Sequence, residues 1–293
     1  MTLEGHTKNV MSVCVSVDRL FSGSQDNTIK VWDIVTGECL QTLEGHTGSV
    51  NSVCVSEDRL FSASDDNTIK VWDMGECVQT LEGHTSHVNS VCMSGNRLFS
   101  GSADSTVKVW DLASGACLQT LQGHTGDVAS VCVAGGRLFS GSWDHTIKVW
   151  DMTGKCLQTL EGHTKNVMSL CVSGNRLFSG SLDNTIKVWD MSGVCVQTLQ
   201  AYGVTSVCVA GDRLFSGSAD KTIKVWNWET GERLRTLEGH TGFVYSVCVS
   251  PERELLFSGS GDNTIKAWDF SRPYLDYSGE AETMGNGISR LRF

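Results

Sequence analysis

Proline and long apolar runs are scarce in this sequence, and their scarcity narrows the class of protein. Only two prolines occur among the 293 residues and no low-complexity segment is present, so we expect no long disordered arm. A run of about 18 apolar residues, which a membrane-spanning helix needs, occurs nowhere. The opening MTLEGHTKNVMSVC has no basic start before an apolar core, so no signal peptide is predicted. We expect a globular protein of the cytoplasm, with the nucleus left open.

Positive charge is also in short supply. The chain carries 33 acidic and 23 basic side chains, a formal net charge of -10. Nucleic-acid binding by counterion release needs an excess of Lys and Arg on one face, so this balance argues against a nucleic-acid partner. No CxxC motif occurs among the 12 cysteines, which argues against a zinc site and a disulfide framework. We therefore expect free thiols, no metal and no other cofactor.

The chain does have a repeat that is marked by tryptophan. Seven tryptophans recur at intervals of 37 to 42 residues, each at the end of a TIKVW-like run, and six of them precede an Asp. This interval is the length of one propeller blade. Within a repeat, VMSVCVS, RLFSGS, TIKVW and CLQTL are short apolar or β-branched runs between turn residues. They predict four antiparallel strands per repeat, which we name a to d in chain order.

A His, a Ser, an Asp and a Trp recur together in these repeats. In the first repeat, His6 lies in a d-to-a loop and Asp26 in a b-to-c turn, which alternating strand directions place at the same end. We expect Asp26 to accept from His6, and the imidazole to connect through Ser22 to the indole N–H of Trp32, with Ser24 as the alternative hydroxyl. A catalytic triad is a single site. A set that returns in six repeats therefore predicts a structural network and no catalytic residue.

The network set is complete in six repeats and broken in one. Its predicted members are His6, Ser22, Asp26, Trp32, His46, Ser62, Asp66, Trp72, His84, Ser100, Asp104, Trp110, His124, Ser140, Asp144, Trp150, His163, Ser179, Asp183, Trp189, His240, Ser258, Asp262 and Trp268. The sixth repeat reads LQAYGVTSVCVA and has lost the Gly-His pair, so Ser216, Asp220 and Trp226 have no imidazole between them. We expect blade 6 to be less stable than the other blades.

The Gly-His pair, the SGSxDxTIKVWD run and their spacing resemble the WD-repeat β-propeller family over about residues 3–269. The resemblance implies an all-β fold, a ring of seven four-stranded antiparallel blades with strand a lining a central channel. It divides the chain into a propeller, residues 1–270, and a C-terminal tail, residues 271–293. Residues 1–3 align with residues 41–43 of strand d and form only a stub of the outer strand of blade 7. We expect the tail to complete that strand through YLDYS or ISRLRF; the alternative is that the chain is a fragment of a longer protein.

Two function classes follow. The resemblance favours a noncatalytic scaffold or substrate-recognition module that binds other proteins or peptides, with no nucleic acid and no membrane as partner. We expect a monomer, or a part of a larger chain or complex. The alternative is an enzyme or small-ligand binder at the mouth of the channel. That alternative needs titratable groups outside the repeat pattern, and the only histidines outside the Gly-His pairs are His87 and His145.

Large apolar residues interrupt the repeat on the Gly-His face, which carries the d-to-a loops and the b-to-c turns. The exposed positions expected there precede each turn Asp or flank the first Val of strand a, and most are small or polar. The exceptions are Trp143, Met168 and Leu182 in repeats 4 and 5, and Phe243, Tyr245 and Met11 in repeats 7 and 1. Such side chains are typical anchors for a protein partner.

At the opposite end of each repeat, the spacing places an Arg across from the Asp that follows Trp. Arg19 falls opposite Asp33, and the equivalent pairs are Arg59 with Asp73, Arg97 with Asp111, Arg137 with Asp151 and Arg176 with Asp190. We expect cross-strand ion pairs there. In the last two repeats the same spacing sets Arg213 against Asn227, and Leu255 against Asp269.

Overall fold

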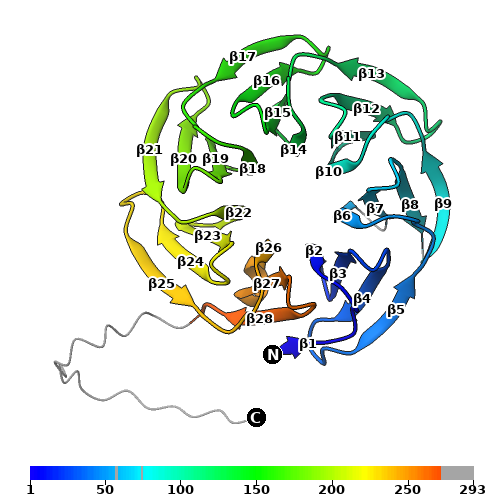
Figure 1. Ribbon diagram of the computed structural model, residues 1–293, viewed down its shortest axis with the longest axis vertical. Coiled ribbons are helices and arrows are strands. Elements are labelled where there is room, and N and C mark those ends of the chain that lie inside the picture. Colours follow the sequence, from blue (N-terminus) through cyan, green and yellow to red (C-terminus); the bar gives the residue numbers. More distant parts are fainter. Residues whose placement is uncertain (57–58, 74, 272–293) are drawn as a thin grey trace.

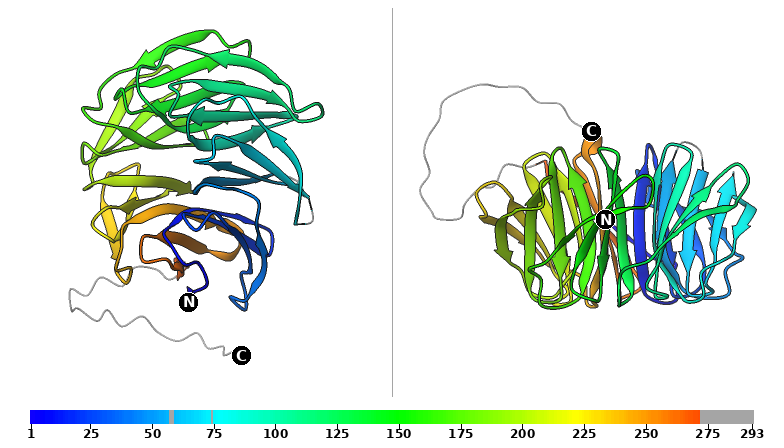
Figure 2. Two further views of the ribbon diagram at one scale, coloured as in Figure 1. Left: turned by 45° about the vertical axis from the view of Figure 1, so that its right-hand side comes forward. Right: turned by 90° about the horizontal axis from the view of Figure 1, so that it is seen from above.

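The computed structural model describes residues 1–56, 59–73 and 75–271, which form a ring of seven blades (Figure 1). Every blade is a four-stranded antiparallel sheet, and one strand of each faces the centre of the ring. The predicted all-β, seven-bladed propeller is confirmed. Figure 2 shows the ring from its side, with the blades standing next to one another. Among the described residues, no helix is long and apolar enough to cross a membrane.

The strands follow the repeat, from the inner strand outward. Blade 1 holds β2 (Val10–Ser16), β3 (Arg19–Ser24), β4 (Ile29–Asp33) and β5 (Cys39–Leu43); blade 2 holds β6 (Val50–Ser56), β7 (Arg59–Ser64), β8 (Ile69–Asp73) and β9 (Glu76–Leu81). Blade 3 holds β10 (Val88–Ser94), β11 (Arg97–Ser102), β12 (Val107–Asp111) and β13 (Cys117–Leu121); blade 4 holds β14 (Val128–Ala134), β15 (Arg137–Ser142), β16 (Ile147–Asp151) and β17 (Cys156–Leu160). Blade 5 holds β18 (Val167–Ser173), β19 (Arg176–Ser181), β20 (Thr185–Asp190) and β21 (Cys195–Gln200); blade 6 holds β22 (Val204–Ala210), β23 (Arg213–Ser218), β24 (Ile223–Asn227) and β25 (Arg233–Leu237). Blade 7 holds β26 (Val244–Ser250), β27 (Leu255–Ser260), β28 (Ile265–Asp269) and β1 (Thr2–Leu3), with a short 3-10 helix, Pro251–Arg253, between β26 and β27.

The hydrophobic core lies between blades. Between blades 1 and 2, Val31 and Leu43 of one sheet pack in a cluster with Val50, Leu60 and Trp72 of the next, all buried. Similar clusters fill the other six interfaces. Burying one such side chain stabilises the fold by about 1.5–3 kcal/mol. Because each blade buries its faces against two neighbours, the ring holds the loops of all seven blades in a fixed arrangement.

The chain start closes the ring. Thr2 and Leu3 pair with Lys266 and Ile265 of β28, and the Met1 carbonyl accepts from Ala267 N at 2.9 Å. Leu3 is 2% exposed and belongs to the core cluster between blades 7 and 1. The first residues therefore form the outer strand of blade 7 as described. The expected contribution of the tail, residues 271–293, falls outside the described residues apart from residue 271.

The strand registers on the face opposite the Gly-His face match the sequence, but the expected ion pairs do not form. Arg19 pairs with Asp33 in the β3–β4 ladder, and the other predicted positions align in the same way. Among the described residues, however, none of the five Arg-Asp pairs makes an ion pair. Asp33 Oδ1 instead accepts from the backbone N–H groups of Val35 and Thr36, both at 2.8 Å. A carboxylate bonded locally to its own turn is favoured over an exposed ion pair, which contributes little.

Candidate functional site

The b-to-c turns position the network carboxylates. In blade 1, Ser24 Oγ accepts from Asp26 N at 3.1 Å and donates to the Lys8 carbonyl at 3.2 Å. Asn27 takes a left-handed φ of 70°, which Asn tolerates better than most residues, and its N–H donates to the Ser24 carbonyl at 3.1 Å. The turn is thereby tied to the d-to-a loop and aims Asp26 at it. Ser24, the alternative hydroxyl for the network, serves this turn instead.

The imidazole of His6 lies between Asp26 and Ser22. The Trp32 indole N–H donates to Ser22 Oγ at 2.8 Å, Ser22 Oγ is 2.7 Å from His6 Nε2, and His6 Nδ1 is 2.8 Å from Asp26 Oδ2. A neutral imidazole protonated on Nδ1 satisfies the chain, because the Ser22 hydroxyl can then donate to Nε2. Ser22 is fully buried and Trp32 is 1% exposed. Both ring nitrogens are therefore used inside the blade.

The same chain of hydrogen bonds recurs in blades 2, 3, 4, 5 and 7. Across the six blades the His-to-Asp distances are 2.6 to 2.8 Å. The His-to-Ser distances are 2.7 to 2.8 Å, and each indole N–H donates to its Ser at 2.8 Å. Each of the six imidazoles belongs to a residue that is 7% exposed. The network residues expected from the sequence thus lie together in all six blades.

The network keeps its carboxylates charged. Burial alone raises the pKa of Asp144, but hydrogen bonds, led by the one from His124, outweigh burial and hold that pKa well below its usual range. The same balance lowers the pKa of Asp262 to about 2. Burial lowers the pKa of His163 and His240, although the neighbouring carboxylates act in the opposite direction. At neutral pH blades 5 and 7 therefore pair an ionised Asp with an uncharged imidazole.

In blade 6, which lacks the imidazole, a lysine binds the turn Asp. The Trp226 indole still donates to Ser216 Oγ at 2.9 Å. Lys224 Nζ donates to Asp220 and, at 3.0 Å, to Thr222 Oγ1, and Lys224 is only 8% exposed. In the other six blades the equivalent Lys donates to a Thr of strand d at 2.8 to 3.2 Å. An ion pair thus occupies blade 6 where the sequence alone indicated an unpartnered Asp.

The six predicted partner-binding residues lie on the Gly-His face in two groups. Trp143 and Phe243 are 45% and 47% exposed. Met11, Met168, Leu182 and Tyr245 are partly exposed. The rings of Phe243 and Tyr245 lie edge to face, with centroids 6.2 Å apart. The first group belongs to the adjacent blades 4 and 5, and the second to blades 7 and 1, which are neighbours in the closed ring (Figure 1).

Polar groups occupy this face on blades 2 and 3. Asn51 Nδ2 donates to Asp65 Oδ1 at 2.7 Å and to the Val88 carbonyl at 3.2 Å. His87 Nδ1 is 3.1 Å from the same Asp65 oxygen.

His145 takes the left-handed position of the blade 4 turn, with a φ of 73°. In the described ranges, no group of three or more His, Cys, Asp or Glu side chains is arranged to hold a metal ion.

All seven repeats match one family model. The model, WD domain, G-beta repeat, matches residues 1–33, 37–73, 75–111, 115–151, 154–190, 193–227 and 231–269. The chain belongs to the WD40 family. Each matched segment contains one tryptophan of the network and ends at or just after the last residue of a strand c. The seven WD40 repeats thus correspond to the seven blades.

Curated WD40-containing relatives are similar over one repeat. The nuclear distribution protein PAC1 of Candida glabrata is 52% identical over 42 residues, 14% of this chain and 9% of that protein. The zinc finger CCCH domain-containing protein 17 of Oryza sativa subsp. japonica is 49% identical over 41 residues, 14% and 9% of the two chains. Human kinesin-like protein KIF21A is 57% identical over 35 residues, 12% and 2%. The matches cover less than a tenth of each of these relatives.

Tyr202, on the sixth WD40 repeat, is a candidate that sequence reasoning missed. It is 61% exposed and lies in the d-to-a loop that lacks Gly-His. Its carbonyl accepts from Ser218 Oγ at 2.6 Å, so the backbone is anchored while the ring is free. The departure of this loop from the repeat was the available signal. Tyr202 joins the two groups into an apolar arc over blades 4, 5, 6, 7 and 1, made of Trp143, Met168, Leu182, Tyr202, Phe243, Tyr245 and Met11.

Proposed function

We propose that this WD40 protein is a noncatalytic interaction scaffold that binds a segment of another protein along the apolar arc. The observation that carries the proposal is the exposure of three large aromatic residues, Trp143, Tyr202 and Phe243, on one face. Aromatic side chains with few rotatable bonds lose little conformational entropy when a partner covers them, and they are the most frequent hot spots of interfaces. The remaining members of the arc extend the apolar contact between them.

The backbone beneath the arc supports this role. Trp143 N donates to the Asp127 carbonyl at 2.9 Å, which ties its turn to the neighbouring loop, and Leu182 N donates to the Asn166 carbonyl at 3.1 Å. In each turn the next residue is a network Asp, Asp144 or Asp183. An anchor held on a rigid scaffold does not need to be ordered when the partner arrives, so less free energy is spent on binding.

The network histidines do not favour the enzyme alternative. A general base must offer a ring nitrogen to a substrate. In His124, Nδ1 and Nε2 lie 2.6 Å from Asp144 and 2.8 Å from Ser140, inside the blade. His87 and His145 lie outside this network, and neither has a nucleophile as a hydrogen-bond partner among the contacts of the described residues. We therefore assign binding, rather than catalysis, to the Gly-His face.

We further propose a reducing compartment such as the cytoplasm. All 12 cysteines are free thiols, and five of them are exposed on the outer strands of blades 1 to 5. These are Cys39, Cys77, Cys117, Cys156 and Cys195. Exposed free thiols are uncommon in oxidising environments, where they would be paired.

Quantitative affinity capture tests the binding face. The variant that combines Trp143→Ser with Leu182→Ser should lose the specific partner captured by the wild-type chain, with a melting temperature within a few degrees of wild type. Leu118→Ser is the matched control, because Leu118 is 49% exposed on the outer strand β13, away from the Gly-His face. The control should capture the partner normally.

A second variant covers the other end of the arc. If the blade 4 and 5 variant retains its partner, Phe243→Ser combined with Tyr245→Ser should abolish capture. Retention of the same partner at normal affinity by both double variants would contradict the proposed face. Steady-state hydrolase assays on the pure wild-type chain address the enzyme alternative, and a turnover abolished by Trp143→Ser would favour it.

A further inference from the structure

The lysines of this chain are distributed unevenly over its surface. Seven of the 11 lie in strand c of a blade, where six donate to a Thr of strand d and one donates to Asp220. Lys155 lies in the c-to-d loop of blade 4, on the face opposite the Gly-His face. The remaining three, Lys8, Lys165 and Lys221, lie on the Gly-His face in blades 1, 5 and 6. These three blades also carry members of the apolar arc.

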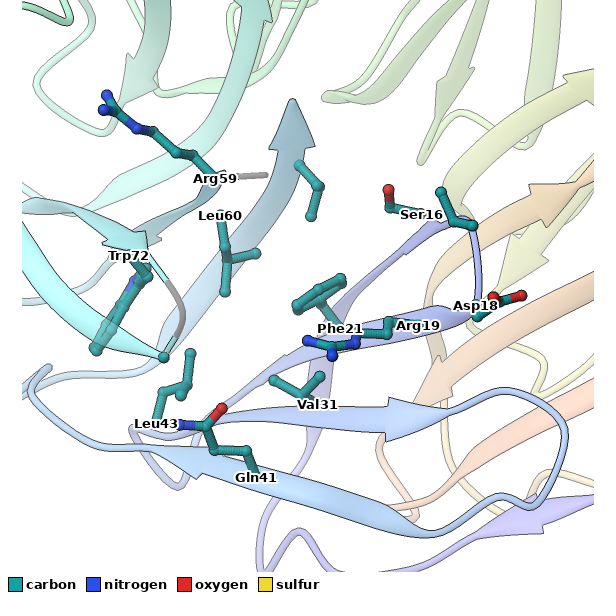
Figure 3. Close-up of a pocket in the computed structure, with 13 residues that line it drawn as sticks. Ser16, Asp18, Arg19, Phe21, Val31, Gln41, Leu43, Arg59, Leu60 and Trp72 are labelled. Carbon is teal, nitrogen blue, oxygen red and sulfur yellow. The ribbon is translucent and has the colours of Figure 1, made fainter. Parts of the chain in front are cut away.

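These three lysines have no partner within the described part of the chain. Each is exposed, and its ammonium group makes no hydrogen bond and no ion pair there. The described arginines lie elsewhere: six begin strand b of blades 1 to 6, two lie on the outer strand β25, and Arg253 lies in the a-to-b connection of blade 7. Figure 3 shows Arg19 and Arg59 on that opposite face, beside a pocket between blades 1 and 2. The Gly-His face therefore presents three cations that are available to a partner.

Blade 6 carries little uncompensated negative charge on this face. Lys224 binds the turn carboxylate of Asp220, whereas the equivalent lysines of the other blades hold their ammonium groups at the outer strand. The loop before blade 6 adds no carboxylate, because Gln200 stands where five repeats have Glu. Those five are Glu4, Glu44, Glu82, Glu161 and Glu238. Lys221, which follows Asp220, therefore has no uncompensated carboxylate beside it in this loop and turn.

Tyr202 lies between the turn of blade 5 and the turn of blade 6. Gly203 N donates to Asn184 Oδ1 at 2.8 Å, which ties the Tyr202 loop to the blade 5 turn. The Gly203 carbonyl accepts from Ala219 N at 2.9 Å, which ties the same loop to the blade 6 turn. That second turn carries Lys221. The exposed ring of Tyr202 and the ammonium group of Lys221 therefore belong to neighbouring segments whose backbones are hydrogen-bonded.

Lys165 flanks the same apolar residues from the other side. Its carbonyl accepts from Ser181 Oγ at 3.1 Å, and the next carbonyl, that of Asn166, accepts from Leu182 N at 3.1 Å. Blades 5 and 6 follow one another in the ring (Figure 1). The order along the face is therefore Lys165, Leu182, Tyr202 and Lys221. Two apolar side chains are thus bracketed by two cations.

The other end of the arc has a similar arrangement with one lysine. The Phe243 carbonyl accepts from Gly261 N at 2.8 Å, which ties the Phe243 loop to the blade 7 turn. In that turn, Asn263 Nδ2 donates to the Thr7 carbonyl at 3.4 Å, and Thr7 precedes Lys8. Phe243 and Lys8 therefore lie on consecutive loops, on either side of one turn.

We propose that the partner of the apolar arc is an acidic segment in which Asp or Glu residues separate large apolar side chains. This inference rests on the proposed binding function and states the chemistry of its partner. The apolar side chains would cover the arc, while the carboxylates pair with Lys165, Lys221 and Lys8. The acidic part would end before blade 4, where the Asp127 carbonyl accepts from Trp143 N and the Asp127 carboxylate adds negative charge. Because the chain has a net charge of -10, other parts of its surface repel such a segment, so the lysines select where it binds.

Labelled peptides provide the test. Four fluorescein-labelled peptides would be titrated against the full chain by fluorescence anisotropy: three Phe residues separated by Glu pairs, by Ser pairs or by Lys pairs, and three Ala residues separated by Glu pairs. The Glu-spaced Phe peptide should bind at least about tenfold tighter than the other three, because only it offers both the apolar anchors and the carboxylates. Its affinity should fall as salt is added, since salt screens exposed charges. Equal affinity for the Glu- and Lys-spaced Phe peptides, or no binding of the Glu-spaced Phe peptide at about 1 mM, would overturn the inference.

Matched variants locate the charges. Lys165→Glu combined with Lys221→Glu should reduce the preference for Glu over Ser spacing to less than about twofold. Lys155→Glu combined with Arg235→Glu changes the net charge of the chain equally, but at exposed positions away from the Gly-His face, and should preserve the preference. Melting temperatures and circular dichroism verify the fold of each variant, and Lys165→Gln with Lys221→Gln repeats the test if charge reversal disturbs folding. An unchanged preference in both double lysine variants would overturn the inference.

The same titrations separate this inference from the proposed function. Trp143→Ser with Leu182→Ser should weaken the Glu-spaced and the Ser-spaced Phe peptides alike. If it does so while the lysine variants change nothing, the arc binds apolar segments without regard to charge, and the inference alone fails. If both peptides bind normally to this variant and to Phe243→Ser with Tyr245→Ser, the proposed binding face fails, and the inference with it.

Discussion

Asp144→Ala should destabilise blade 4 more than removal of any exposed carboxylate. The Asp144 side chain accepts four hydrogen bonds: from His124 Nδ1 at 2.6 Å, from Thr125 N at 3.1 Å, and from Thr146 N and Oγ1 at 2.9 and 2.7 Å. Without it, the Nδ1–H of a buried imidazole has no acceptor, which costs about 1–3 kcal/mol. Thr125 is exposed and its N–H can bond to water. With the partly buried Thr146 bonds included, we expect a loss of about 3 kcal/mol.

Urea unfolding followed by tryptophan fluorescence measures this loss. With a slope of about 3 kcal/mol/M for a chain of this size, the midpoint should fall by about 1 M. Asp127→Ala, at a nearby loop position, is the control and should shift the midpoint by less than about 0.2 M. If Asp144→Ala also shifts the midpoint by less than about 0.2 M, the network does not stabilise the blade and the reasoning is refuted.

Stability should decrease on acidification. The pKa of His163 and His240 is lowered below 6.5 in the folded chain. The unfolded chain therefore takes up these protons first, and their contribution, complete above pH 6.5, declines below it. Asp262, with a pKa of about 2 against an ordinary 3.8, adds a loss below about pH 4; melting temperatures from pH 8 to 3 check both, and a flat profile would contradict them. Lys224→Met should destabilise the protein by about 1–2 kcal/mol, because it leaves Asp220 without its cation. The equivalent change at the partly exposed Lys148, Lys148→Met, should alter stability by less than about 0.5 kcal/mol. Equal urea midpoints would show that Lys224 does not replace the imidazole. Leu3→Asp should lower the melting temperature and promote aggregation, since it places a charge in the core between blades 7 and 1. Thr2→Asp, on the exposed side of β1, is the control and should be tolerated. Unaltered light scattering and an unaltered melting temperature of Leu3→Asp would argue against closure by β1.

The fold and the network could be predicted because the strand pattern recurs in seven repeats and the network residues recur in six. One repeat leaves the partner of His6 ambiguous, but a similar spacing between His, Ser, Asp and Trp that returns in six of the seven blades allows few geometries. The register of Arg19 against Asp33 followed from the same spacing. The spacing could not show whether Arg19 or the backbone N–H groups of the turn would bind the Asp33 carboxylate. Backbone N–H groups of the adjacent turn lie within reach at no cost in side-chain entropy, so they displace the expected ion pair.

Features that occur in only one blade were harder to predict from the sequence. The loss of a His in blade 6 was visible in the sequence. The sequence did not show that Lys224 would bind Asp220 rather than a Thr of strand d, as the equivalent lysines do, because this depends on the three-dimensional arrangement of the two acceptors. The exposure of Tyr202 depends on a loop that no other blade repeats. The binding roles of the apolar arc remain predictions.

The buried hydrogen-bond chains also give the molecule built-in spectroscopic reporters. In six blades the indole N–H donates to a Ser whose oxygen continues to an imidazole, and such chains polarise their members. In blade 6 the chain stops at Ser216. In a proton–nitrogen correlation spectrum, the Trp226 side-chain signal should therefore separate from those of the other six network indoles. Its rate of deuterium exchange in nitrogen-15-labelled protein would report the opening of blade 6 alone, with no probe attached to any side chain.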